Sequence, residues 1–157
     1  MEKSKMNWDE TVSNMGDTLS GIRAAFGGGE TDIRTYSPLT FAYIGDAVFE
    51  LIVRTVIVEQ GQRPANTLHR HTTKLVCAKT QAKLIEAVYD TLSEEEQNIY
   101  RRGKNTKINS TAKNASLSDY RKATGFEALC GYLFLKNEME RVIEIVKSAL
   151  ELARVEI

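Results

Sequence analysis

The sequence contains few of the residues that build cysteine- or histidine-based sites. Cys77 and Cys130 are the two cysteines among 157 residues; they stand far apart in apolar stretches and form no CxxC pair. This arrangement argues against a zinc site and predicts two reduced thiols in the core of a cytoplasmic protein. His69 and His71 are two residues apart, so on a helix they face different directions and do not form a histidine metal pair.

Long apolar runs and phosphate-loop motifs are also missing. No run reaches the roughly 18 apolar residues that a membrane span needs, and the N-terminal stretch MEKSKMNWDETV lacks the apolar centre of a secretory signal. We therefore expect no membrane segment and no targeting peptide. Because the sequence has no GxxxxGK[ST] loop and no Ser-His-Asp or Cys-His pattern, nucleotide binding by such a loop and nucleophilic catalysis have little support.

Proline is scarce as well, and both prolines stand where a helix can begin. Ser37-Pro38 is typical of a helix N-cap followed by proline, and the stretches 93–96 and 116–119 match S-x-x-E and S-x-x-D capping patterns. Apolar residues make up 42% of the chain, enough for one core, and no strand alternation is evident. The sequence predicts an all-α fold with helices over residues 38–58, 65–92 (in two pieces), 94–102, 117–135 and 139–155.

The first 33 residues are predicted to form an extension to a domain that spans residues 34–157. Six apolar residues of this extension recur at helical spacing: Trp8, Val12, Met15, Leu19, Ile22 and Phe26. The glycines at 27–29 would end this helix and supply a flexible joint. Two interpretations remain, a helix that packs on the domain or on a partner subunit, and a disordered tail.

Two acidic residues interrupt apolar helical stretches. Asp46 lies in AYIGDAVFELIVR, residues 42–54, which is apolar nearly all round and which we expect to form a central, buried helix. Burying an unpaired carboxylate costs several kcal/mol, so such a group is usually paired, protonated or bound to a metal. Asp46 is therefore either paired with a basic residue, or the cap of another helix, or a metal ligand with Glu50 on the same face.

Glu127 is the second such acid, in ATGFEALCGYLFL, residues 123–135. If the helices that carry Asp46 and Glu127 pack side by side, both carboxylates can hold one cation. Mg²⁺ prefers oxygen ligands and keeps several waters, so two carboxylates and a substrate phosphate suffice. The pattern alone does not decide whether the two acids converge.

The chain is neutral overall, but residues 100–122, the basic segment, are not. Seven Lys or Arg residues and one Asp give this segment a net charge of +6, so the remainder carries −6. Its central stretch GKNTKINSTAKNAS, residues 103–116, has no clear periodicity and is predicted to be a loop. The segment is either a solvated basic loop or a surface for nucleic-acid phosphates. Its lack of Trp and Phe favours duplex RNA over single strands.

At these residues the sequence resembles the ribonuclease III family. AYIGDAVFE, residues 42–50, resembles the signature helix E-F-L-G-D-A-V-L-E, and GFEALCGYLFL, residues 125–135, resembles the second motif D-x-x-E-A-L-x-G-x-x-x-L. Further stretches are similar to the compact subfamily called Mini-ribonuclease III: LHRHTTKLVCAKTQA, IYRRGKNTK and AKNASLSDYRKATGFEAL. The resemblance covers about residues 36–152 and leaves the N-terminal extension outside.

The sequence departs from the larger family where two acids are expected. Ala42 stands where the first motif has a glutamate, and Thr124 where the second has an aspartate. These losses are typical of the Mini-ribonuclease III subfamily. Gly125 is a smaller departure, since alanine is expected there. The chain also ends without room for the double-stranded RNA-binding domain of a full-length ribonuclease III, so we expect the basic segment to supply more of the RNA contact.

The resemblance implies a Mg²⁺-dependent endoribonuclease, with Mn²⁺ as a substitute, that cuts double-stranded RNA and leaves 5′-phosphate ends. Asp46 and Glu127 would be the catalytic metal ligands, and Glu50 is a candidate for a contact through an outer-shell water. The residues expected to bind the RNA backbone are Arg101, Arg102, Lys104, Asn105, Lys107, Lys113 and Asn114.

The implied partners are a second copy of the chain in a homodimer and the large-subunit (23S) ribosomal RNA precursor, with ribosomal protein assistance left open. Two other interpretations stay open from the residues. The first is a catalytically inactive module that binds double-stranded RNA, which the absent acids at Ala42 and Thr124 favour. The second is a helical protein-interaction module with an incidental basic loop.

Overall fold

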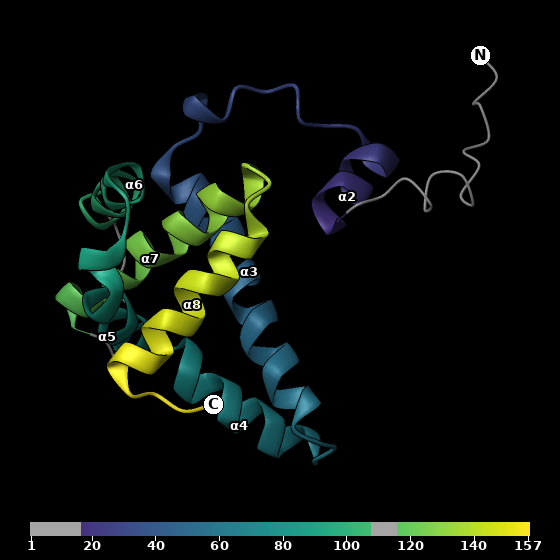
Figure 1. Ribbon diagram of the computed structural model, residues 1–157, viewed down its shortest axis with the longest axis vertical. Helices are drawn as coiled ribbons and strands as arrows, with labels where there is room; N and C mark the ends of the chain where they lie inside the picture. Colours follow the sequence, from purple (N-terminus) through teal and green to yellow (C-terminus); the bar gives the residue numbers. More distant parts are fainter. Residues whose placement is uncertain (1–16, 108–115) are drawn as a thin grey trace. The chain divides into compact units, whose positions relative to one another are not determined.

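The computed structural model describes residues 17–107 and 116–157 of the chain, which divides into two compact units, residues 1–35 and 36–157 (Figure 1). In the described part of the first unit, helix α2 (Thr18–Phe26) precedes a short 3₁₀ helix, η1 (Ile33–Thr35). Helix α2 begins after the N-cap Asp17 and ends at Gly27, which has a φ of 80°. Helix α2 covers the last part of the predicted N-terminal helix. Trp8, Val12 and Met15 of its apolar stripe lie outside the described residues, and the role of the extension stays a prediction.

The second unit is built from helices. In chain order they are α3 (Pro38–Glu59), α4 (Ala65–Val76), α5 (Ala78–Val88), the 3₁₀ helix η2 (Tyr89–Thr91), α6 (Glu94–Lys104), α7 (Leu117–Leu135) and α8 (Met139–Ala153). No β-strand occurs over residues 17–107 and 116–157, so the all-α prediction is confirmed. The predicted piece 65–92 is divided at Cys77, whose extended backbone separates α4 from α5.

The helix starts follow the capping signals in the sequence. Ser37, Ser93 and Ser116 each accept a hydrogen bond from the backbone N–H of the third residue of the helix that follows. At α6 the Glu96 carboxylate also accepts from the Ser93 N–H, which completes the capping box. The predicted break after α7 is confirmed at Asn137, which has a φ of 64°.

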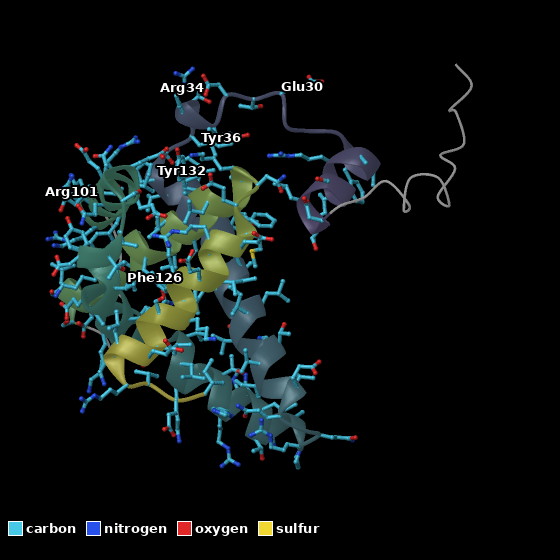
Figure 2. The ribbon with its side chains drawn as sticks, in the orientation of Figure 1. Glu30, Arg34, Tyr36, Arg101, Phe126 and Tyr132 are labelled. Atoms are coloured by element: carbon cyan, nitrogen blue, oxygen red, sulfur yellow. The ribbon has the colours of Figure 1, made fainter. Side chains whose placement is uncertain are left out.

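Helix α7 lies at the centre of this unit and packs against α3, α5, α6 and α8 (Figure 1). Phe126 of α7, labelled in Figure 2, is fully buried. Its ring meets that of Phe49 of α3 edge to face, with the ring centroids 5.2 Å apart. Phe41 and Tyr132 repeat this contact nearer the start of α3, at 5.3 Å. These aromatic pairs fix α3 and α7 side by side, as the site prediction required.

Helix α3 is not buried all round, so that expectation was wrong. One face packs on α7, but five large apolar side chains remain exposed to solvent: Leu39, Tyr43, Leu51, Val56 and Val58. Tyr43 is 83% exposed. A helix that is apolar on every side can still have one side in contact with solvent, because composition does not show which sides other helices of the chain pack against. In α3 part of the apolar surface is not covered by any other part of the described chain.

Three smaller expectations also need correction. Cys130 is a buried thiol as predicted, but Cys77 is exposed because it stands at the junction of two helices rather than inside one. The predicted loop 103–116 begins later, since α6 continues through Lys104, and its residues 108–115 lie outside the described part. The last helix ends at Ala153, before Val155. Within the described residues, no helix has the length and apolar character to cross a bilayer.

Candidate active site

Two glycines determine how closely α3 and α7 approach. A Cβ added at Gly45 would lie 1.7 Å from the backbone oxygen of Glu127, and one added at Gly131 would lie 1.9 Å from the backbone oxygen of Phe41. Real Cβ atoms do not come this near to backbone atoms, so a side chain at either position would force the helices apart. The glycines therefore bring Glu127 beside the turn of α3 that carries Asp46.

Glu127 is the acid that is withdrawn from water. Its carboxylate is part-buried and its Oε1 atom accepts a hydrogen bond from Gln81 Nε2 at 3.1 Å. Burial, and then the negative charge of Asp46, raise the pKa of Glu127 to about 7, although the Gln81 hydrogen bond lowers it. The charge effect means that the two carboxylates are close enough to repel each other.

Asp46 is exposed, which contradicts the expected buried aspartate. It stands on the side of α3 that the chain does not cover. Partial desolvation, followed by the charge of Glu50, raises the pKa of Asp46. The sequence predicted that both acids would be buried at a cost. In the structure only Glu127 is withdrawn from water, and Asp46 stands on the solvent side of the same site.

The donor set fits a hard divalent cation. Two carboxylates that repel each other gain from a shared cation, and Mg²⁺ needs few protein ligands because it retains waters. Among the residues that the structure describes, no group of three His, Cys, Asp or Glu side chains is arranged to hold a metal. Ala42 and Thr124, where the family pattern has acids, are both buried, and the Thr124 hydroxyl donates to the Tyr120 carbonyl at 2.9 Å. A cation here would have Asp46 and Glu127 as its carboxylates.

Glu50 has a partner of its own. Its carboxylate lies 3.6 Å from Arg54 Nε, one helical turn further along α3. The charge of Glu50 thus acts on Asp46 and raises its pKa, but the Glu50 carboxylate itself is paired with Arg54. Its contact through an outer-shell water stays a prediction.

The burial of the Glu127 carboxylate, together with the charge of Asp46 beside it, has a measurable cost in the metal-free protein. A carboxyl whose pKa is higher in the folded state than its ordinary 4.5 makes the fold less stable as pH rises from about 4.5 to about 7. Glu127→Gln removes that loss, and at roughly 1.4 kcal/mol per pKa unit the gain at pH 8 is on the order of 3 kcal/mol. We expect urea unfolding in EDTA to show the variant more stable than wild type at pH 8 and similar at pH 4. An equal difference at both pH values would contradict the buried-carboxylate interpretation.

The basic residues of α6 form a second surface. Arg101 and Arg102 are exposed, as are Asn105 and Lys107 beyond the helix, and Lys104 is half-buried. Figure 2 shows Arg101 at the outer edge of α6, where its guanidinium donates to the Tyr89 hydroxyl at 3.3 Å. Lys113 and Asn114, the other two predicted RNA contacts, lie outside the described residues.

Ion pairs hold the start of α6 against α8 and hold α7 against α5. At the start of the helix, Glu96 accepts two hydrogen bonds of 2.8 Å from the Arg141 guanidinium of α8, and this pair lowers the pKa of Glu96. Beyond α6, Lys122 of α7 pairs with Glu86 of α5. A hollow of about 420 Å³ lies between these elements and is lined by Tyr89, Tyr100, Arg101, Lys104 and Lys122, among others. The exposed cations are thus presented on a packed scaffold.

Close packing also explains Gly125, which looked like a small departure in the sequence. A Cβ there would lie 2.7 Å from the backbone oxygen of Tyr100, and one at Gly103 would lie 2.8 Å from the Cβ of Ala128. Glycine at both positions lets α6 lie directly on α7.

Sequence reasoning missed one residue of the site. Gln81 of α5 is 1% exposed and reaches Glu127 through its amide. The sequence did contain a signal for Gln81, because it is a polar residue within an otherwise apolar helical stripe of α5. Its partner, Glu127, becomes evident only when α5 packs on α7.

Known proteins resemble the chain along most of its length. The sequence profile of the family described as Ribonuclease III domain matches residues 39–138. A Mini-ribonuclease 3 from Thermoanaerobacter sp. is 49% identical over 151 residues, which are 96% of this chain and 97% of that protein. One from Clostridium tetani is 47% identical over 77% of this chain and 81% of that protein. A crystal structure of a protein from Fusobacterium nucleatum has a TM-score of 0.71 and 30% identity, and the match covers 78% of this chain and 99% of that one.

These matches give the class of protein first. The helical unit is a ribonuclease III domain, the fold of an endoribonuclease, and α3 and α7 carry the two motifs on which the sequence resemblance rested. Within that class, the chain belongs to the Mini-ribonuclease 3 family.

Proposed function

We propose that the chain is a Mg²⁺-dependent endoribonuclease that cuts double-stranded RNA at the site formed by Asp46 and Glu127. The observation that carries this proposal is the pair of electrostatically coupled carboxylates where α3 crosses α7. Mn²⁺ has the same preference for oxygen ligands and would substitute for Mg²⁺.

In this proposal each acid has its own task. Asp46, on the solvent side, would hold the cation where the RNA backbone can reach it. Glu127, fixed from behind by α5, would supply the second carboxylate from a less polar environment, where charge interactions are stronger. When bound, the cation would polarise a phosphoryl oxygen and lower the pKa of the attacking water, which gives products with a 5′-phosphate and a 3′-hydroxyl.

The exposed end of α6 would hold the duplex. Arg101, Arg102, Lys104 and Lys107 would neutralise phosphates, while Asn105 would hydrogen-bond phosphates or 2′-hydroxyls. Lys113 and Asn114 remain part of this prediction. Because these proposed contacts go to phosphates and 2′-hydroxyls and not to bases, they would recognise the shape of the duplex more than its sequence.

Removing the three cations of α6 should weaken RNA binding and reduce its dependence on salt. In Arg101→Ala/Arg102→Ala/Lys104→Ala, the slope of log Kd against log salt should fall by about 1 for every phosphate that the wild-type side chains neutralise. Filter binding of an uncut duplex in EDTA, from low to moderate salt, measures both effects. Lys147→Ala on α8 is the control and should bind as wild type. Unchanged affinity in the triple variant would remove α6 from the RNA surface.

The resemblance to the Mini-ribonuclease III subfamily also suggests a substrate and an assembly. We infer that the natural duplex is in the large-subunit ribosomal RNA precursor, which would place the enzyme in the cytoplasm, and that two copies act together with one site each. The exposed apolar surface of α3 supports a dimer, since burial of Leu39, Tyr43 and Leu51 against a partner would remove apolar area from water.

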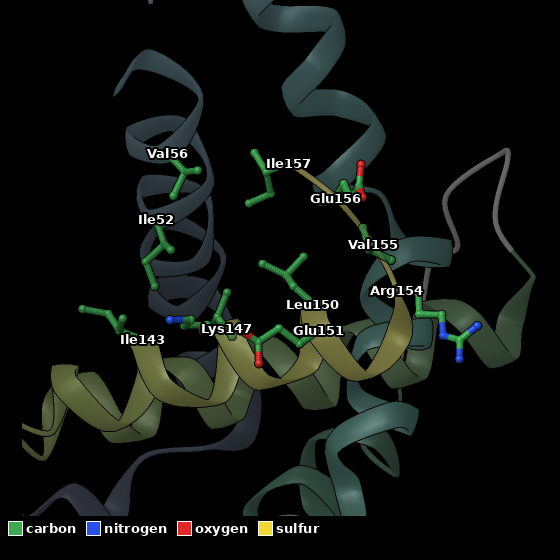
Figure 3. A pocket seen from close by; sticks show the side chains of 11 residues that line it. Ile52, Val56, Ile143, Lys147, Leu150, Glu151, Arg154, Val155, Glu156 and Ile157 are labelled. Atoms are coloured by element: carbon green, nitrogen blue, oxygen red, sulfur yellow. The ribbon is translucent and has the colours of Figure 1, made fainter. Parts of the chain in front are cut away.

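An apolar groove of about 680 Å³ lies beside the later part of α3, where Ile52 and Val56 face Leu150 and Ile157 (Figure 3). None of the proposed catalytic residues lines it.

The direct test is cleavage of a long RNA duplex by the wild-type protein with Mg²⁺, with EDTA as the control. We expect fragments with 5′-phosphate ends and no cutting in EDTA. A protein that binds the duplex but never cuts it would instead be the inactive binding module that Ala42 and Thr124 favour. Absence of any salt-dependent RNA affinity would point to the protein-interaction module.

A further inference from the structure

Gln81 joins the candidate catalytic glutamate to the scaffold behind it. The side chain extends from α5, is 1% exposed, and donates from Nε2 both to Glu127 Oε1 at 3.1 Å and to the Val76 carbonyl at 2.9 Å. Val76 is the last residue of α4. One amide group therefore ties the carboxylate on α7 to the junction of α4 and α5.

The chemistry of its two partners fixes which way the amide points. Both a carboxylate oxygen and a backbone carbonyl are acceptors, so only the NH₂ group of the glutamine can face them. The amide oxygen must then point elsewhere, and within the described residues Gln81 Oε1 is buried and has no hydrogen-bond partner. A buried acceptor without a donor is unfavourable, yet this position is a glutamine although its amide oxygen has nothing to bind in the described part of the chain.

We propose that Gln81 is a positioning residue that holds one oxygen of the Glu127 carboxylate, so that the other oxygen faces the cation shared with Asp46. This inference rests on the cation site of the proposed function and extends it by one residue. The two hydrogen bonds occupy both amide hydrogens, and the second one, to Val76, prevents the amide from rotating away with the carboxylate. Carboxylates that bind metals are commonly oriented by such a second hydrogen bond, and its loss typically costs 10–100-fold in metal affinity or activity.

The experiment separates positioning from folding by measuring the cation directly. Mn²⁺ binding to the RNA-free protein is followed by electron paramagnetic resonance, and unfolding is followed in EDTA. Gln81→Met keeps the length of the side chain but has no donor, and we expect 10–100-fold weaker Mn²⁺ binding in a protein that still folds. RNA affinity in EDTA should be unchanged, and saturating Mn²⁺ should restore much of the lost cleavage.

A matched control comes from α6. Gln97 is also part-buried and donates from Nε2 to a backbone carbonyl, that of Tyr89 at 3.0 Å. Gln97→Met removes an equivalent amide–carbonyl bond with no carboxylate attached, so its Mn²⁺ affinity should equal that of wild type. Should Gln81→Met not fold, Gln81→Asn serves in its place. Its shorter side chain cannot span Glu127 and Val76, and the same loss of affinity is expected.

The outcomes distinguish this inference from the proposed function. If Glu127→Gln loses Mn²⁺ binding but Gln81→Met binds as wild type, the positioning role is wrong and the cation site stands. If Glu127→Gln binds Mn²⁺ as tightly as wild type, the cation site is wrong and Gln81 has nothing to position. A Gln81→Met protein with lower stability but unchanged Mn²⁺ affinity would show a purely structural residue.

Discussion

Asp46→Asn and Glu127→Gln should each abolish cleavage of double-stranded RNA while leaving RNA binding intact. Each variant keeps the size of the side chain and removes one of the two negative charges that would hold the cation. Loss of a single group that stabilises charge in a transition state commonly costs about 10²–10³-fold in rate, and we expect at least that. The measurement is single-turnover cleavage of a long duplex with saturating Mg²⁺.

Two further variants serve as controls for the change of charge. Asp90 in η2 and Glu140 at the start of α8 are exposed acids, so Asp90→Asn and Glu140→Gln should cut as wild type. RNA affinity in EDTA should stay equal or rise slightly in the two site variants, because a negative charge has been removed near a polyanion. Residual activity above about a tenth of wild type in either site variant would mean that its carboxylate is not a cation ligand.

Gly45→Ala should be the most destabilising single substitution on α3. The added methyl group would meet the Glu127 carbonyl at 1.7 Å, and because both atoms belong to regular helices, only a shift of α3 against α7 can relieve the clash. Overpacking of a core typically costs about 1–3 kcal/mol, and a clash with backbone belongs at or above the upper end of that range. Urea unfolding at pH 7 measures the loss.

Ala47→Gly on the exposed side of the same helix gives the comparison. It changes helix propensity by roughly 1 kcal/mol at an exposed position. Any Gly45→Ala protein that folds should also cut poorly, because the shift that relieves the clash separates Asp46 from Glu127. A Gly45→Ala protein that is as stable as Ala47→Gly would show that the helices do not cross this closely.

The sequence alone determined the helices and named the two acids. Caps at Ser37, Ser93 and Ser116 are local signals, because the capping side chain bonds to a backbone group three residues away. Helical periodicity is equally local. The helix boundaries were therefore predicted to within a few residues, and Asp46 and Glu127 stood out because each interrupts an apolar stretch.

Only the tertiary structure decided which acid is buried, which face of α3 is uncovered and what stands behind Glu127. These depend on which helix faces meet, and that is decided by contacts between residues far apart in the chain: Gly45 against the backbone of Glu127, and Gln81 against its carboxylate. A glycine in a helix signals only a weak helix former until the neighbouring backbone is in place. Sequence periodicity describes one helix at a time, whereas a site shared by three helices exists only once they pack.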